Sequence, residues 1–189
     1  MKLETIDECI WKCNKCKNLV EKFPKAKTIH FGTDNDIVLI GEAPANNGWR
    51  KSGMVWRDVN GKMLPSGVIL QKLFDEIGRD ILDTTFIEAI KCFPVKRSNI
   101  PVCLENCNGI LISQLECLKP KVVITLGDAA TRSLLGNSYK NFKEVVGKLF
   151  NINGLNILPI YHPSPISPMS YKGNISIFEK LRDGKYEIK

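Results

Sequence analysis

The sequence has 189 residues, of which 43% are hydrophobic and 25% charged, which fits one folded domain and excludes a mainly disordered chain. Lysine and arginine outnumber aspartate and glutamate by 27 to 20, a net charge of +7 that suits nucleic acid as a partner without requiring one. No apolar stretch approaches the roughly 18 residues that cross a bilayer, and the start lacks the apolar centre of an export signal, so we expect a cytoplasmic protein without membrane contact.

Four apolar runs are typical of strands buried in a parallel sheet. They cover residues 37–40, 85–90, 122–126 and 156–160. Amphipathic stretches predict helices over about 66–77, 104–118, 128–135 and 175–181. Because strands and helices alternate, we predict an α/β protein with a single domain over residues 1–189. Its three layers, α/β/α, would surround a four-stranded parallel sheet.

In sheets of this kind ligands bind outside the carboxyl ends of the strands, so the loops after the strands form the candidate site. Three of these loops contain unusual residues: GEAPA from Gly41, KCFP from Lys91 and HPSP from His162. We therefore expect the chemistry of the protein to lie in these three segments.

The cysteines indicate a metal or cluster site, because there are seven of them and no export signal, which argues against disulfide pairing. Cys13 and Cys16 form a C-x2-C pair, and the distant Cys92 and Cys107 can complete a four-sulfur site. Such a site suits zinc or a [4Fe–4S] cluster. It would tie the N-terminal segment, about residues 9–22, to the sheet.

Alternatives remain for the ligand set. Cys9 and Cys103 compete with Cys13 and Cys107 as ligands, whereas Cys117 lies on a predicted amphipathic helix and is expected in the core. Reduced cysteines buried as small hydrophobic side chains are the alternative to any metal site.

The GEAPA loop follows the first strand directly and has almost no bulky side chain before Trp49. It is not a phosphate-binding P-loop, because no Gly-Lys-Ser/Thr follows. Its small side chains let backbone N–H groups approach a planar ligand closely. Trp49 and Trp56 can stack on a base, or can be ordinary core or surface residues.

His162 follows the last predicted strand and precedes Pro163 and Pro165. The two prolines restrict the backbone, so the imidazole is held at the mouth of the sheet. An imidazole in that place can donate a hydrogen bond to an oxygen that gains negative charge as a bond breaks.

Together, these segments resemble the uracil-DNA glycosylase superfamily over roughly residues 9–182. They are most similar to its iron–sulfur-containing family 4 and family 5 enzymes. Five motifs in the family's order carry the resemblance: GEAPA, GMVW followed by SG, KCFP, KPKVVITLG and YHPSP.

The resemblance implies a [4Fe–4S] cluster rather than zinc. The cluster would be structural, since hydrolysis of an N-glycosidic bond needs no electrons. Cys107 is preferred to Cys103 because its distance to the Lys-Pro pair at 119–120 matches the family spacing. The implied ligands are Cys13, Cys16, Cys92 and Cys107.

The resemblance also implies a monofunctional DNA glycosylase of base-excision repair, acting on uracil or another deaminated base that is flipped into a pocket. His162 and backbone N–H groups of the loop 41–45 would stabilise the leaving base, and Trp56 would stack on its ring. No lysine nucleophile is evident, so no lyase activity is expected. The base-binding residues would be Gly41, Ala43, Pro44, Ala45, Trp56 and Glu88.

Residues 165–173 resemble the family's loop that enters the minor groove of DNA. Ile166 or Met169 would fill the space left by the flipped base, as apolar wedges do. Ser164 and Lys172 would contact phosphates. The alternative is an ordinary surface loop.

The sequence departs from the family at the base-reading position, where family 4 members usually have asparagine and this chain has Glu88. An ionised carboxylate accepts hydrogen bonds from uracil N3–H but offers no donor to O4. A preference for hypoxanthine or xanthine is therefore an alternative to uracil. Pairing of Glu88 with a lysine, away from the base, is the structural alternative.

The second departure concerns the water molecule, because Ala43 stands where the commonest uracil glycosylases have a catalytic aspartate. Glu42 is the favoured group, since it is the carboxylate fixed inside the strand-end turn. The backbone carbonyl near Pro44, Asn47 and Asp58 are the alternatives.

Two other classes of protein are alternatives to the enzyme. The first is a non-catalytic relative of the same fold that binds DNA or nucleotides, and a Pro-fixed His162 argues against it. A cysteine-rich redox protein is disfavoured, because no C-x-x-C lies at a strand-to-helix turn of the sheet. We expect a monomeric enzyme whose partner is DNA containing a deaminated base.

Overall fold

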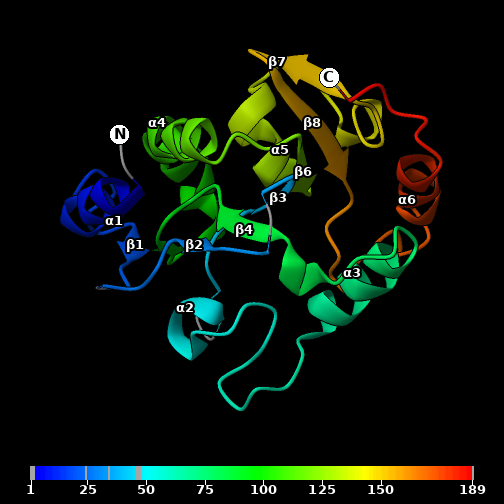
Figure 1. Cartoon of the computed structure of the whole chain (residues 1–189). Coiled ribbons are helices and arrows are strands. Elements are labelled where there is room, and N and C mark those ends of the chain that lie inside the picture. The colour runs from blue at the N-terminus through cyan, green and yellow to red at the C-terminus, as the bar shows by residue number, and fades with distance from the viewer. Residues whose placement is uncertain (1–2, 24, 34, 46–47, 189) are drawn as a thin grey trace.

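The computed structural model describes residues 3–23, 25–33, 35–45 and 48–188. Its centre is a mixed sheet of six strands in the order β2-β4-β3-β6-β8-β7 (Figure 1). The strands are β2 (Ile29–His30), β3 (Ile37–Gly41), β4 (Thr85–Glu88), β6 (Val122–Leu126), β7 (Phe150–Ile152) and β8 (Leu155–Ile160).

The α/β class is confirmed, but the prediction of a four-stranded, all-parallel sheet is wrong. The four predicted strands, β4, β3, β6 and β8, are parallel and form the centre of the sheet. β2 and β7 are added at the edges in antiparallel pairing. These edge strands have two and three residues, too short to show a hydrophobic period in the sequence.

The predicted helices are present as α3 (Pro65–Asp75), α4 (Ile100–Leu118), α5 (Asp128–Leu135) and α6 (Ile175–Arg182). α3 and α4 begin earlier than predicted, since each has a proline in its first turn, where the missing N–H costs nothing. Two further helices, α1 (Leu3–Lys12) and α2 (Trp49–Ser52), were not predicted. Short 3-10 helices cover Ile81–Asp83, Arg97–Asn99 and Phe142–Glu144.

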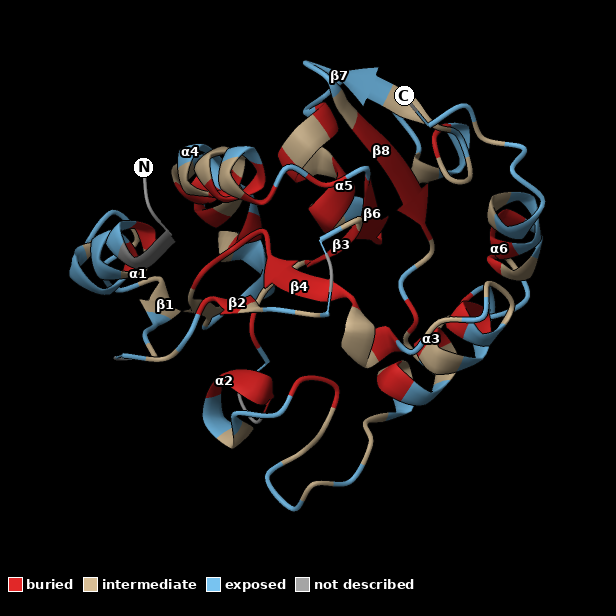
Figure 2. Cartoon of the chain, viewed as in Figure 1, coloured by how far each residue is buried: buried red, intermediate tan, exposed pale blue. Residues whose placement is uncertain are grey.

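Helices cover both faces of the sheet, as Figure 1 shows. α3 and α6 pack on the face that carries Leu39, and α4 and α5 pack on the face that carries Val38. Phe74 of α3 and Phe178 of α6 meet edge to face, with ring centroids 5.2 Å apart. Consecutive residues of β3 are thus buried in different cores, which explains why the central strands read as continuous apolar runs. Figure 2 shows these strands as the buried centre of the molecule.

The N-terminal segment joins the rest of the molecule through a second, two-stranded sheet. β1 (Val20–Glu21) pairs antiparallel with β5 (Phe93–Pro94), directly after Cys92. α1 packs against α4. In the described part of the chain, no helix is long and apolar enough to cross a membrane.

Candidate active site

A cleft of about 1200 Å³ opens at the carboxyl ends of β3, β6 and β8. Glu42 lines it after β3, Gly127 and Asp128 after β6, and His162 and Ser164 after β8. Parallel strands bring these loops to one edge of the sheet. The two residues predicted to be catalytic, Glu42 and His162, therefore lie in one cavity together with the predicted DNA contact Ser164.

The backbone around His162 is packed closely against the end of β6. Gly127 has a left-handed φ of +87°, and a Cβ built there would lie 3.0 Å from the Cβ of His162. Only glycine combines that conformation with that close approach. On the other side, the N–H of Ser164 donates to the carbonyl of His162 at 2.8 Å.

A buried amide holds the residue before His162. The side chain of Asn174 accepts from the N–H of Tyr161 at 2.8 Å and donates to the carbonyl of Tyr161 at 2.8 Å. The same amide donates to the carbonyl of Ser170 at 2.9 Å, which ties the 161–170 loop to the start of α6. Asn174 is fully buried, so these bonds are protected from water. The imidazole of His162 is thus carried on a fixed backbone.

Glu42, Arg97 and His162 form the charged part of the cleft. Arg97 Nη2 donates to Glu42 Oε2 at 3.3 Å, and the arginine is largely exposed while the glutamate is mostly shielded. The protein atoms around His162 displace part of its water and lower its pKa below the usual value, although the side chain is still exposed at the mouth of the cleft; Glu42 opposes this shift and Arg97 adds to it. At neutral pH the imidazole is therefore uncharged, with one N–H to donate.

The start of the GEAPA loop is held by hydrogen bonds from the residues that follow β4. The N–H groups of Ala89 and Ile90 donate to the carbonyls of Gly41 and Glu42 at 2.8 and 2.9 Å. A Cβ at Gly41 would lie 3.0 Å from the ring of Phe86, so glycine there admits that ring. In this structure the space above Gly41 is occupied by Phe86.

The other predicted base-binding residues of the loop differ in exposure. Pro44 is buried, Ala43 is half-buried and packs against the small core cluster that contains Ile90, and Ala45 is exposed. Asn47, an alternative for holding water, lies outside the described residues. Asp58, another alternative, accepts from the N–H groups of Asn60 and Lys62 and shapes its own turn.

Trp56 lies in the core rather than on the wall of the cleft. Its ring packs on Phe86 with centroids 4.6 Å apart, and its φ of +60° is left-handed, which is uncommon for a bulky residue. Among the described residues, its buried indole N–H has no hydrogen-bond partner. Trp56 thus contacts Phe86, and the Phe86 ring in turn lies against Gly41. Trp56 is not among the described residues that line the cleft with His162.

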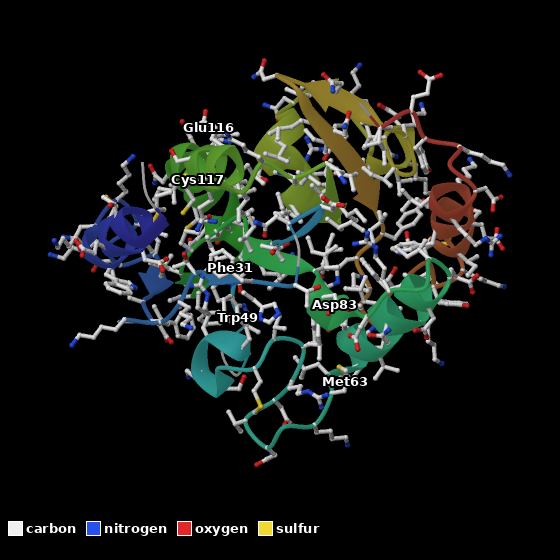
Figure 3. The ribbon with its side chains drawn as sticks, in the orientation of Figure 1. Phe31, Trp49, Met63, Asp83, Glu116 and Cys117 are labelled. Carbon is white, nitrogen blue, oxygen red and sulfur yellow. The ribbon has the colours of Figure 1, made fainter. Side chains whose placement is uncertain are left out.

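Glu88 is buried at the end of β4 and holds the tail of the same loop. Its Oε1 accepts from the indole N–H of Trp49 at 2.5 Å, and its Oε2 accepts from Nε and Nη2 of Arg50 at 3.1 and 2.8 Å. The ion pair is almost fully buried. Figure 3 shows Trp49 between α2 and the sheet. Glu88 thus pairs with an arginine and a tryptophan, where the sequence suggested a lysine as the structural alternative.

The predicted DNA-contacting loop is exposed, but its two apolar candidates differ. Ile166 is 91% exposed, whereas Met169 is 39% exposed and its methyl group lies over Gly173 beside Tyr161. Lys172 is exposed. Ile166 is thus the side chain that extends from the surface.

The four predicted ligand cysteines line one cavity between the N-terminal segment, the loop after β4 and α4: Cys13, Cys16, Cys92 and Cys107. Burial, together with the nearby Cys107 and Cys13, raises the pKa of the Cys92 thiol to about 11. Cys103 is buried and hydrogen-bonds to Cys16, whereas Cys9 is exposed. Within the described residues, no group of three or more acidic, histidine or cysteine side chains is arranged to hold a metal ion.

Comparison with known proteins places the chain in a family. The model of the uracil-DNA glycosylase superfamily matches residues 29–182, which include all strands of the main sheet and the whole cleft. The chain belongs to the uracil-DNA glycosylase superfamily.

Named relatives within this superfamily are of two types. A type-4 uracil-DNA glycosylase of Saccharolobus solfataricus is 32% identical over 86% of this chain and 76% of its own length. Another, of Archaeoglobus fulgidus, is 26% identical over 87% of this chain and 84% of its own. A type-5 uracil-DNA glycosylase of Pyrobaculum aerophilum is 28% identical over 69% of this chain and 62% of its own length.

Two residues that organise this glycosylase-family cleft were missed by sequence reasoning. Arg97 lies in the predicted KCFP loop, where the basic run KRSN was the one available signal. Asn174 gave no signal, because its partners are backbone groups at positions 161 and 170.

Proposed function

We propose that the protein is a monofunctional DNA glycosylase that hydrolyses the N-glycosidic bond of uracil flipped out of DNA, in base-excision repair. Its membership of the superfamily and its relatives named type-4 and type-5 uracil-DNA glycosylases support the reaction class. The observation that carries the proposal is that Glu42 and His162 line one cleft at the ends of β3 and β8.

In the proposed mechanism, the two residues act on opposite ends of the bond that breaks. The C1′–N1 bond breaks and its electron pair goes to the base, whose O2 then carries negative charge. The uncharged imidazole of His162 donates a hydrogen bond to that oxygen. Glu42, held by Arg97, takes the proton of the water that attacks C1′.

Uracil is proposed as the base because the relatives are named uracil-DNA glycosylases. Because Glu88 stands at the base-reading position, hypoxanthine and xanthine remain as alternatives to uracil. Both oxygens of its carboxylate already accept hydrogen bonds, from Trp49 and Arg50. Any contact that Glu88 makes with a base therefore uses it as an acceptor from an N–H group. Uracil N3–H is such a group.

We further propose that the four cysteines hold a structural [4Fe–4S] cluster. Four thiols from three separate segments meet at one cavity whose walls include Ile10, Val20 and Ile90. Soft thiolate ligands suit either metal, and the resemblance to the iron–sulfur-containing family 4 and family 5 enzymes favours the cluster. When bound, it would link the N-terminal segment to the loop after β4 and to α4.

The experiment is incubation of the purified protein with single- and double-stranded oligonucleotides that carry uracil, hypoxanthine, xanthine or thymine, followed by alkaline cleavage. We expect cleavage at uracil. Cleavage at hypoxanthine or xanthine in its place would overturn the base assignment. No cleavage of any substrate by the folded protein would overturn the enzyme in favour of a non-catalytic relative.

A further inference from the structure

A further cavity, of about 280 Å³, lies between the N-terminal segment and the loop after β4, where it shares Lys22, Lys91 and Cys92 with the cavity lined by cysteines. Its volume is at the small end of the range for small-molecule pockets, roughly 300–1,000 Å³. None of the described residues that line it is acidic. We call it the basic pocket, and its polar and aromatic lining consists of Trp11, Lys22, Phe23, Lys25, Arg50, Lys91 and Cys92.

The aromatic wall of the basic pocket is held in place by hydrogen bonds. The indole N–H of Trp11 donates to the carbonyl of Ala26 at 3.1 Å. Lys22 Nζ donates to the carbonyl of Trp11 at 3.3 Å and to Oδ1 of Asn14 at 3.1 Å. Both acceptors of Lys22 are uncharged, so these hydrogen bonds leave its positive charge without a counter-charge.

The floor and the rim of the basic pocket have different roles. Arg50 and Lys91 are buried at its floor, with exposed fractions of 8% and 2%. Arg50 is balanced by Glu88, and Lys91 donates to the backbone carbonyl of Glu88. Lys22 and Lys25 are exposed at the rim, where their charges act on a ligand that enters.

We propose that the basic pocket binds one unpaired nucleotide of the DNA strand, outside the catalytic cleft. Its base would stack on the ring of Trp11, and its phosphate would contact Lys22 and Lys25. Positive charge beside aromatic rings is the combination that proteins use for single-stranded nucleic acid. The proposal rests on the proposed function, because that function makes DNA the polyanion at this surface.

The topology of the sheet connects the basic pocket to the cleft. Arg50 lines the pocket and holds Glu88 at the end of β4, and the parallel register pairs Glu88 with Gly41 at the end of β3. The cleft begins at Glu42, the next residue. The basic pocket and the cleft therefore both adjoin the carboxyl ends of the neighbouring strands β3 and β4.

The test measures equilibrium binding of an undamaged single-stranded oligonucleotide by the full chain, over a range of salt concentrations. The variant is Lys22→Ala with Lys25→Ala. The matched control is Lys148→Ala with Lys180→Ala, which removes the same charge from exposed lysines. Lys180 is on α6, at the opposite edge of the molecule from α1 (Figure 1).

We expect the rim variant to bind about 10-fold more weakly and the logarithmic salt dependence to fall by about 0.7, because the contact with one phosphate is lost. The control should change the affinity by less than about 2-fold, as general charge effects do. Equal weakening in both variants, or no weakening in either, would overturn the proposal.

Stacking is tested separately at Trp11. We expect Trp11→Ala to weaken binding between roughly 5-fold and 100-fold, and Trp11→Phe to keep most of the affinity, because a phenyl ring still stacks. Equal loss in both variants would contradict a stacking role.

Two further measurements separate this proposal from its competitors. Deoxythymidine 5′-monophosphate that binds to the wild type but not to the rim variant, with oligonucleotide binding unchanged in that variant, would assign the pocket to free nucleotides and overturn the DNA assignment. If the wild type binds the oligonucleotide through the rim lysines but releases no base from any damaged strand, the proposed function fails and the pocket assignment stands.

Discussion

Glu42 is the single residue on which the proposed hydrolysis depends most. It follows β3 directly, its backbone carbonyl accepts from Ile90, and its carboxylate is held by Arg97 on the wall of the cleft. A residue whose backbone and carboxylate are each held by a hydrogen bond can keep a water molecule in one position, which is where general-base catalysis gains its rate. Asp58 is occupied with the N–H groups of its own turn.

The first prediction is that Glu42→Gln lowers the single-turnover rate of uracil excision by about 10²–10⁴-fold, since the amide cannot take a proton from water. The control is Asp58→Asn, which should leave the rate within about 2-fold. Excision by Glu42→Gln at the wild-type rate would exclude Glu42 as the base.

The second prediction concerns the pKa of His162, which NMR can follow because the chain has only two histidines. Glu42 raises this pKa and Arg97 lowers it, so Glu42→Gln should lower the titration midpoint and Arg97→Ala should raise it. His30, whose pKa is lowered by burial and raised by the carbonyl of Leu82, should keep its midpoint in both variants. If the titration midpoint of His162 were the same in both variants as in the wild type, Glu42, Arg97 and His162 would not share one cleft.

Site residues that directly follow a strand could be predicted from the sequence. Site residues that act through partners far away in the chain could not. Glu42 and His162 follow apolar runs, so the topology of the sheet alone brings them together. Asn174 and Arg97 act through partners 13 and 55 positions away, and no local pattern marks such pairs. The pairing of Glu88 with Arg50 likewise depends on how α2 folds back on β4.

The short helix α2 shows how an element can be positioned by one buried ion pair. Its four residues are too few for a stable helix of their own. Trp49 and Arg50 both donate to Glu88, and Trp49 also contacts the edge of the Phe86 ring, with centroids 6.1 Å apart. α2 was not predicted because four residues show no helical period, whereas α4 and α5 were, because their apolar faces repeat.

The third prediction is that Glu88→Gln lowers the free energy of unfolding by about 3 kcal/mol, because it leaves the guanidinium of Arg50 buried without a counter-charge. Arg50→Met added to Glu88→Gln should restore part of the loss. The control, Glu76→Gln, removes the surface pair with Arg182 and should change stability by less than about 1 kcal/mol. Urea unfolding followed by circular dichroism measures all three, and equal effects at Glu88 and Glu76 would contradict the account.

In the whole molecule, the cavity lined by cysteines connects segments that are far apart in the sequence. Cys13 and Cys16 lie in the N-terminal segment, Cys92 after β4 and Cys107 on α4. The spacing of the cysteines predicted that they could meet, and the structure shows all four lining one cavity. Hydrogen bonds between β1 and β5 lie next to it, so loss of a bound cluster would loosen both segments together.

The fourth prediction is that Cys107→Ser lowers the iron and sulfide content of the purified protein and lowers its melting temperature. Cys117→Ser is the control on the same helix, labelled in Figure 3, and should keep both values, because Cys117 is not among the described residues that line the cavity. Zinc in place of iron in the wild type, or equal metal content in both variants, would contradict the proposed cluster.

The most direct test of the proposed function is the release of free uracil from a single-stranded oligonucleotide with one uracil, under single-turnover conditions. The wild type is compared with the double variant Glu42→Gln, His162→Asn. We predict that the wild type releases the uracil and leaves a strand that breaks only after alkali, while the double variant releases none on the same time scale. No release by the folded wild type, or equal release by both proteins, would contradict the proposed function.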